Sequence, residues 1–235
     1  MKGMSKWVQW VPFYSMVFLL VLLLSLLGNR TATAMSEYTP LPGRHCVLID
    51  AGHGGEDGGA TSCAGILEST YNLEIALRLE KVLQLLGYQT KMIRTGDYAV
   101  HREGQTIAAR KASDLRERVA LANNTEGAVL ISIHQNYFPE SKYSGAQVFY
   151  ADTPESADFA KLLQSEIRKI LNPGSKRQEK KASGIYLMEH VSCPAVLIEC
   201  GFLSNPQEEV LLRDSRYQKK LCGVIASVLG TYFRT

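Results

Sequence analysis

Short apolar runs that each end in a polar side chain most strongly constrain how this chain can fold. The runs VLID, VLISIH and VLIE are each long enough for one buried strand, and segments with helical periodicity separate them. Strands that alternate with helices predict an α/β protein with a mostly parallel sheet. In such a protein the polar groups at the carboxyl ends of neighbouring strands meet at one edge of the sheet, where ligands bind.

The same patterns predict the individual elements. We expect strands over 45–50, 89–93, 128–133, 145–150 and 195–199, and loops over 95–111 and 172–183. We expect helices over 69–86, 115–123 and 154–171, then one short and one longer helix from Pro206. Ser69 and Ser113 are the candidate N-caps, and Gly87 is the candidate stop of the first helix. The prediction is a single α/β domain with a twisted, mostly parallel sheet covered by helices on both faces.

A leader with a long uncharged stretch precedes this domain. Lys2 and Lys6 form a positive start, and 7–28 is a stretch of 22 residues without charge. Ala32-Thr33-Ala34 offers the small residues of a cleavage signal. A cleaved signal peptide and an uncleaved membrane anchor both fit, because the stretch is also long enough to span a bilayer. In either case the positive-inside rule places the following domain outside the cytoplasm.

We divide the chain into a leader at 1–34, a linker at 35–44 and a catalytic domain at 45–235. The net charge of +3 belongs to the leader, which holds three of the 26 basic residues and no acid. The remainder carries 23 basic and 23 acidic residues, so the domain has no basic excess that would indicate a nucleic-acid partner. The full chain has 46% apolar and 21% charged residues, which is typical of a protein with a folded core.

Four side chains suggest a catalytic metal centre. His53, His134 and Glu199 stand where apolar runs pass into polar loops, and Glu68 precedes the first predicted helix. An acid beside a helix N-terminus is often explained by the helix dipole alone, so Glu68 gains meaning only with its companions. Two imidazoles and one carboxylate supply three zinc ligands and leave a fourth position for water, and a second carboxylate supplies a general base. The set predicts metal-assisted hydrolysis with one zinc ion.

Two neighbouring residues have less certain roles. Asp50 is close enough in sequence to contact a histidine ligand on the side away from the metal and so to orient its ring. Arg94 could contact a carboxylate of the substrate or could pair with Asp97. A nucleotide site in the glycine-rich segment 52–57 is excluded, because an acid stands where the dinucleotide fingerprint requires its third glycine.

These residues and their surroundings resemble the zinc-dependent N-acetylmuramoyl-L-alanine amidases. The matching blocks are IDAGHGGEDGGA at 49–60, Glu68, ISIH with Asn136 at 131–136, and LIECGFLSNP at 197–206. The resemblance implies that His53, Glu68 and His134 bind zinc and that Glu199 is catalytic. It also implies that the substrate is peptidoglycan, cleaved at the amide that joins N-acetylmuramic acid to L-alanine of the stem peptide.

Three further blocks resemble the branch of this family that acts in germination of endospores. They are RKASDLRER at 110–118, SGAQ at 144–147 and GIYLM at 184–188. For this chain the resemblance implies removal of peptides from spore cortex between the two forespore membranes. A muramic acid deacetylase would then complete muramic-δ-lactam, which makes that enzyme a functional partner.

Three alternatives stay open at this stage. The chain could be a vegetative cell-wall amidase, or autolysin, with the same chemistry. It could be a zinc peptidase that cuts within the stem peptide, because the metal chemistry is shared. It could also be a catalytically silent wall-binding module on the same fold, although the presence of Glu199 argues against this.

Overall fold

The computed structural model describes residues 16, 18, 19 and 45–234 of the chain. Apart from these three positions, the predicted leader lies outside the described residues, as does the whole of the predicted linker. The chain divides into two units, Met1–Pro42 and Gly43–Thr235. No helix among the described residues is long and apolar enough to cross a membrane.

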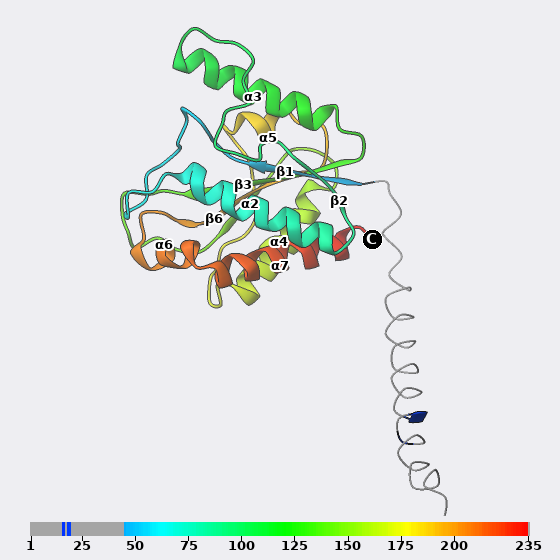
Figure 1. Ribbon diagram of the computed structural model, residues 1–235. Helices are drawn as coiled ribbons and strands as arrows, with labels where there is room; N and C mark the ends of the chain where they lie inside the picture. The colour runs from blue at the N-terminus through cyan, green and yellow to red at the C-terminus, as the bar shows by residue number, and fades with distance from the viewer. Residues whose placement is uncertain (1–15, 17, 20–44, 235) are drawn as a thin grey trace, which may run out of the picture. The chain divides into compact units, whose positions relative to one another are not determined.

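The second unit alternates strands and helices along most of its length (Figure 1). Its strands are β1 (Cys46–Ala51), β2 (Gln89–Met92), β3 (Ala128–Asn136), β4 (Gln147–Tyr150), β5 (Lys180–Lys181) and β6 (Ala195–Phe202). Its helices are α2 (Glu68–Leu85), α3 (Ile107–Asn123), α4 (Ser156–Ile170), α5 (Tyr186–His190), α6 (Pro206–Arg213) and α7 (Ser215–Tyr232). This order confirms the predicted α/β class.

The six strands form one sheet in the order β2-β1-β3-β6-β4-β5. Every neighbouring pair is parallel except β4 and β6, which run antiparallel. The central strands β1, β3 and β6 are nearly all buried, as expected for strands covered on both faces. The predicted mostly parallel sheet is therefore confirmed.

Helices cover both faces of this sheet (Figure 1). On one face α2, α4 and α7 enclose the larger core, which takes Val47 and Ile49 from β1. On the other face α3 and α5 enclose a smaller core, which takes Leu48 from the same strand. Successive side chains of a strand point to opposite faces, so this alternation assigns each position of the strand to one core.

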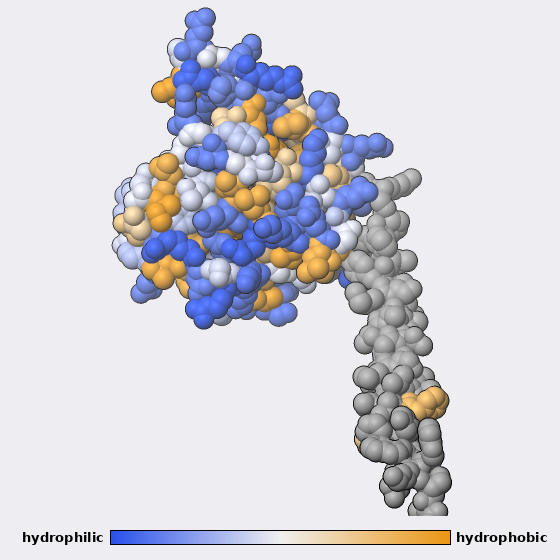
Figure 2. All heavy atoms as spheres, viewed as in Figure 1, coloured by the Kyte–Doolittle hydropathy of each residue, from blue (hydrophilic) through white to orange (hydrophobic). Residues whose placement is uncertain are grey.

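Helix α3 has a hydrophilic outer surface (Figure 2), and it differs from a simple amphipathic helix in the side that it buries. Hydrophilic residues cover most of the visible surface over α3. Its buried positions include Asp114, Arg118 and Ala122, which recur at four-residue spacing on the side that faces the sheet. The inner side of α3 is thus partly charged, and its contact with the sheet uses ion pairs as well as apolar packing.

Several predicted boundaries were wrong. Helix α3 begins at Ile107 and not at 115, and Thr106 caps it by accepting a hydrogen bond from the Ala109 N–H at 3.1 Å. Ser113 is therefore not a cap, and the predicted loop 95–111 ends in a helix. The short elements α5 and β5 were not predicted.

Ser69 does not cap α2 either, because the helix begins one residue earlier, at Glu68. Its first N–H groups are satisfied by the preceding loop. The Glu68 N–H donates to the Ala60 carbonyl at 2.8 Å, and the Ser69 N–H donates to the Gly58 carbonyl at 3.0 Å. These bonds take the place of a side-chain cap and fix the entry of α2 against the glycine-rich loop.

A buried ion pair joins α3 to the sheet. Arg118 donates to Asp50 at the end of β1 at 2.5 Å and to Asp114 one turn earlier at 2.6 Å. Ser132 on β3 also donates to Asp50, at 2.6 Å. Burial alone would favour the neutral acid, but the Arg118 guanidinium holds the pKa of Asp50 below its usual range. Removing one partner of such a pair leaves an uncompensated buried charge.

We predict that Asp50→Asn lowers the free energy of unfolding by about 3 kcal/mol, because Arg118 loses its principal counter-charge. Equilibrium urea denaturation measures this difference. The matched control is Glu103→Gln, which removes an exposed pair with Arg116 at 3.8 Å and is expected to change stability by less than about 0.5 kcal/mol. An Asp50 variant as stable as the wild type would contradict the prediction.

The same comparison has a predicted pH dependence. Because the folded-state pKa of Asp50 is depressed, its contribution to stability is complete above the unfolded pKa of about 4 and is lost as pH falls through the folded value. The stability gap between the wild type and Asp50→Asn should therefore narrow below about pH 4.

Candidate metal centre

Strand register brings the first two site residues together. In the parallel pairing of β3 with β6, His134 is directly opposite Glu199. Two positions earlier on each strand, Ser132 is opposite Leu197, and Leu197 belongs to the core beneath α3 and α5. Because side chains alternate, His134 and Glu199 point to that same face, at the carboxyl end of the sheet.

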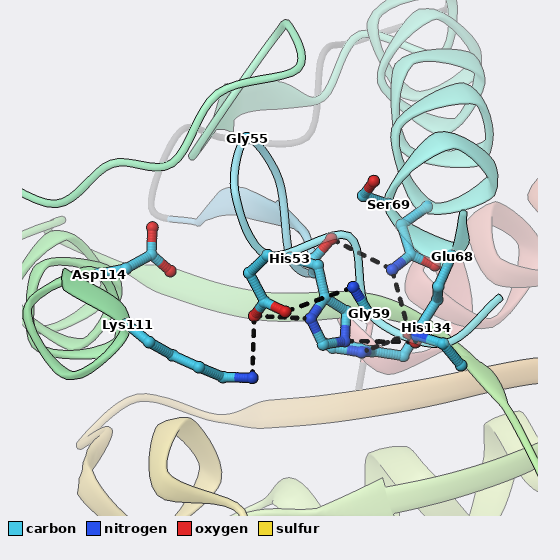
Figure 3. Close-up of polar contacts among 12 residues, drawn as sticks. His53, Gly55, Gly59, Glu68, Ser69, Lys111, Asp114 and His134 are labelled. Atoms are coloured by element: carbon cyan, nitrogen blue, oxygen red, sulfur yellow. Dashed lines mark hydrogen bonds and ion pairs between the residues drawn. The ribbon is translucent and has the colours of Figure 1, made fainter. Parts of the chain in front are cut away.

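Three metal-ligating side chains converge at this point. One ligand atom each from His53, Glu68 and His134 lies within 4.8 Å of the others, and no ion is part of the structure. Nε2 of His53 is 3.3 Å from Oε2 of Glu68, and Nδ1 of His134 is 3.0 Å from Oε1 of Glu68. Figure 3 shows both rings turned toward the Glu68 carboxylate. Three of the four predicted residues therefore form one cluster that could hold a metal ion.

His53 is held in an unusual backbone conformation. Its φ is 61°, in the left-handed region that costs a non-glycine residue about 1–2 kcal/mol. Arg118 from α3 donates to the His53 carbonyl at 2.7 Å, which holds the backbone in place. The strained backbone of His53 thus directs this ring toward Glu68 and His134 at some cost in stability, which is typical of functional loops.

The carboxylate that orients the His53 ring is Asp57 and not Asp50. Oδ2 of Asp57 is 2.9 Å from Nδ1 of His53, which leaves Nε2 facing Glu68. Lys111 reaches across from α3 to the same carboxylate at 3.0 Å (Figure 3). Asp50 acts one step further away, because it holds Arg118, and Arg118 holds the His53 carbonyl.

Glu68 is held by hydrogen bonds to both of its oxygens. The Ala60 N–H donates to Oε2 at 3.1 Å, and the Gln135 N–H donates to Oε1 at 3.1 Å. Asn72, one turn along α2, donates to Oε1 at 3.3 Å and to the Gly52 carbonyl at 3.1 Å. These bonds fix a buried carboxylate between the two imidazoles before any ligand binds.

The pKa values of the cluster reflect this arrangement. Burial works against the charge on His53, but hydrogen bonds to Asp57 and Glu68 raise the pKa of His53 to about 9. Burial likewise opposes ionisation of Glu68, but hydrogen bonds from His134 and His53 hold the pKa of Glu68 well below its usual range. A cation placed between these groups would meet an ionised carboxylate.

Glu199 differs from Glu68 in its surroundings. Burial raises the pKa of Glu199 to about 7, and its Oε2 is buried without a hydrogen-bond partner among the described residues. An unpartnered buried carboxylate oxygen is costly unless a ligand or water meets it. Its place beside two imidazoles and a carboxylate, the donor set of a catalytic zinc site, fits a bound metal with its water.

A cavity of about 190 Å³ opens over this cluster. It is lined by His53, His134 and Glu199 at the sheet edge, and by residues of α3 and the α5 region on the outside. Tyr186 forms part of the outer wall and remains 36% exposed. The cavity therefore lies between the three converging side chains and these two helices.

The remaining predicted residues lie near the cluster but do not join it. Asn136 ends β3, and its carbonyl accepts a hydrogen bond from the Leu203 N–H at 2.8 Å. Arg94 is fully buried and donates to backbone carbonyls, whereas the Asp97 carboxylate accepts from the Gly55 N–H at 2.9 Å. Neither of the two roles considered for Arg94, a substrate contact or a pair with Asp97, is the contact that the structure shows.

Sequence reasoning missed Asp57, Asn72 and Gln135. Asp57 follows His53 by four residues in the glycine-rich block, so a search for nearby acids on both sides of the histidine could have found it. Asn72 follows Glu68 by four residues on the same helix, whereas Gln135 carries no local signal, because it bonds to Asn72 across 63 residues of sequence.

The family model of the N-acetylmuramoyl-L-alanine amidases matches residues 47–230, which covers most of the chain. This chain belongs to that family. Family membership makes it an enzyme, an amidase that acts on peptidoglycan. The site residues described above all lie within the matched region.

Individual relatives agree with this assignment. The germination-specific N-acetylmuramoyl-L-alanine amidase of Bacillus subtilis (strain 168) is 39% identical over 232 residues, which is 98% of this chain and 97% of that relative. The probable cell wall amidase LytH of Staphylococcus epidermidis is 33% identical over 87% of this chain, which spans 64% of that relative's length. Among solved structures, the CwlD amidase from Clostridioides difficile in complex with the GerS lipoprotein is similar with a TM-score of 0.77. It is 34% identical, and the match covers 81% of this chain and 98% of that chain.

Gly52 gives a test of the amidase centre that substitutes none of the predicted ligands. A Cβ built on Gly52 would lie 2.1 Å from Nε2 of His134, so alanine must displace the ring. We predict that Gly52→Ala weakens zinc binding about tenfold or more, as loss of ligand orientation does elsewhere. Competition with a chromogenic chelator measures the zinc dissociation constant.

Gly223→Ala is the matched control, because a Cβ at this position in α7 meets nothing within 4 Å. It should keep the wild-type zinc affinity and gain a little stability from the better helix former. If Gly52→Ala bound zinc as tightly as Gly223→Ala, the packing of His134 against Gly52 would have no part in forming the site.

Proposed function

We propose that this chain is a zinc-dependent N-acetylmuramoyl-L-alanine amidase with His53, Glu68 and His134 as ligands and Glu199 as the general base. The observation that carries the proposal is the convergence of the three donors beside a buried carboxylate oxygen of Glu199 that has no hydrogen-bond partner within the described part of the chain. The ligand set leaves a coordination position open, which is the pattern of catalytic and not structural zinc sites. No cysteine belongs to the cluster.

The residues divide the chemistry between them. Zinc, when bound, supplies a Lewis acid that acidifies water and polarises a carbonyl. Glu199 accepts the proton of the attacking water and returns it to the nitrogen of L-alanine as the amide C–N bond breaks. Asp57 keeps the His53 ring in one orientation, and the N–H groups of Ala60 and Gln135 keep Glu68 in place. The reaction consumes one water and releases a carboxylic acid and an amine.

For the biological role we propose removal of stem peptides from spore cortex, as a step toward muramic-δ-lactam. The support is the match in sequence and in length to a relative described as germination-specific. We propose that the leader exports the domain, either as a cleaved signal or as a membrane anchor, into the space between the forespore membranes. Coupling to a muramic acid deacetylase stays a prediction of this role.

A protein partner is a separate proposal. The similar CwlD structure contains the GerS lipoprotein, so we propose that this chain also binds a membrane-anchored protein. Such a partner would hold the enzyme at a membrane surface whether or not its own leader is cleaved. Copurification of the tagged chain from sporulating cells, compared with vegetative cells, would test the proposal.

The test of the reaction is a digest of purified peptidoglycan by the full-length protein, with and without a chelator, read by mass spectrometry. We expect chelator-sensitive release of intact stem peptides that begin with free L-alanine. Products cut inside the stem peptide would assign the chain to the peptidases. No product from zinc-loaded protein would contradict the amidase proposal unless addition of the partner restored activity.

Glu199→Gln separates the base from the metal. We predict that the variant keeps zinc and the fold but loses turnover by about 10²- to 10⁴-fold, because the glutamine side chain cannot accept a proton from the attacking water. Glu166→Gln, at a half-buried position of α4 where the acid pairs with Lys169, is the control and should keep full activity. His134→Ala should instead lose bound zinc, read by metal analysis. Near-normal hydrolysis by Glu199→Gln would remove Glu199 from the mechanism.

A further inference from the structure

Arg94 is a fully buried guanidinium whose hydrogen bonds all go to backbone carbonyls. It follows the end of β2 by two residues. Nε donates to the Ala51 carbonyl at 2.7 Å, and Nη1 donates to the Gly96 carbonyl at 2.8 Å. Nη2 donates twice, to the Gly52 carbonyl at 3.0 Å and to the Ser69 carbonyl at 2.9 Å.

Three of the four acceptors belong to the segments that carry His53 and Glu68. Ala51 and Gly52 immediately precede His53, and Ser69 immediately follows Glu68. One rigid, planar group therefore joins the end of β1 to the first turn of α2. The fourth acceptor, Gly96, closes the turn on which the arginine itself sits, so the guanidinium is anchored on its own side as well.

The surrounding contacts extend this connection to the ligands themselves. The Gly52 carbonyl also accepts from Asn72, and Asn72 donates to the Glu68 carboxylate. The backbone of Gly54, with φ 128°, approaches so closely that an added Cβ would be 2.9 Å from Nε of Arg94. The loop on both sides of His53 is thus built around the guanidinium.

An apolar side chain of similar size could fill the same space without the cost of burying a cation. The guanidinium offers five N–H groups in a fixed fork, and four hydrogen bonds here have acceptors in three separate segments. A lysine ammonium at the same place is a point donor on a flexible stem and could not reproduce this arrangement.

We propose that Arg94 is a positioning residue that sets the separation of His53 from Glu68 and so preorganises the zinc site. This proposal rests on the proposed function only for the identity of the metal. It predicts that loss of the fork leaves all three ligands present but weakens zinc binding, because the segments must be ordered when the metal binds. The expected loss is about 10- to 100-fold in affinity, the range found for groups that orient metal ligands.

The test compares zinc dissociation constants of the full-length wild type, Arg94→Met and Arg94→Lys, measured by competition with a chromogenic chelator. We expect both variants to bind more weakly, and Arg94→Met to be the weaker. The absorption bands of the cobalt-substituted protein give a second readout, because they respond to ligand geometry. We expect them to shift or lose intensity in both variants.

Leu163→Ala is the matched control, since it removes a fully buried side chain of α4 from the larger core. It should lower the free energy of unfolding by about 2–5 kcal/mol and leave the zinc affinity and cobalt spectrum unchanged. This separates loss of general stability from loss of preorganisation.

The outcomes are distinct. Arg94 variants that fold and bind zinc with wild-type affinity would overturn this proposal alone. If Arg94→Met does not fold, a folded Arg94→Lys with wild-type affinity and cobalt spectrum would overturn it equally. A wild-type protein that binds no zinc would overturn the proposed function and this inference with it.

Discussion

The parallel register of β1, β3 and β6 is the constraint on which the rest of the structure depends. It sets Asp50 opposite Ser132 and His134 opposite Glu199, all on the face that α3 and α5 cover. A shift of one residue in the pairing of β6 would turn Glu199 into the larger core beneath α2, α4 and α7. The amidase site therefore depends on two apolar strands that carry polar residues at the same level.

Buried, hydrogen-bonded guanidinium groups also hold the site in place. The loop that carries His53 has an unfavourable backbone conformation and few apolar side chains, so hydrophobic packing cannot hold it. Instead, Arg118 of α3 donates to the His53 carbonyl, and Arg94 donates to the carbonyls of the two residues before His53. Both guanidinium groups are buried, and their cost is offset by the carbonyls and acids that they contact. Stability and ligand geometry are thus supplied by the same contacts.

Much of this site could be predicted from the sequence, because its chief residues stand where apolar runs pass into polar segments. His53, His134 and Glu199 were found in this way, and Glu68 completed the ligand set. The start of α3 was missed because positions 107–112 are exposed or half-buried and the first buried residues are Ser113 and Asp114, so hydrophobic periodicity gives no signal there. The roles of Arg94 and Asn72 could not be predicted, since each depends on carbonyls that only the folded backbone brings within reach.

The most direct test of the account is a crystal structure of the zinc-loaded protein with anomalous data collected at the zinc absorption edge. The account predicts one ion, bound by a nitrogen of His53, a nitrogen of His134 and a Glu68 oxygen at about 2.0–2.2 Å, with Glu199 nearby but not bound to it. An ion coordinated by Glu199 in place of Glu68, or an ion bound away from these residues, would contradict it.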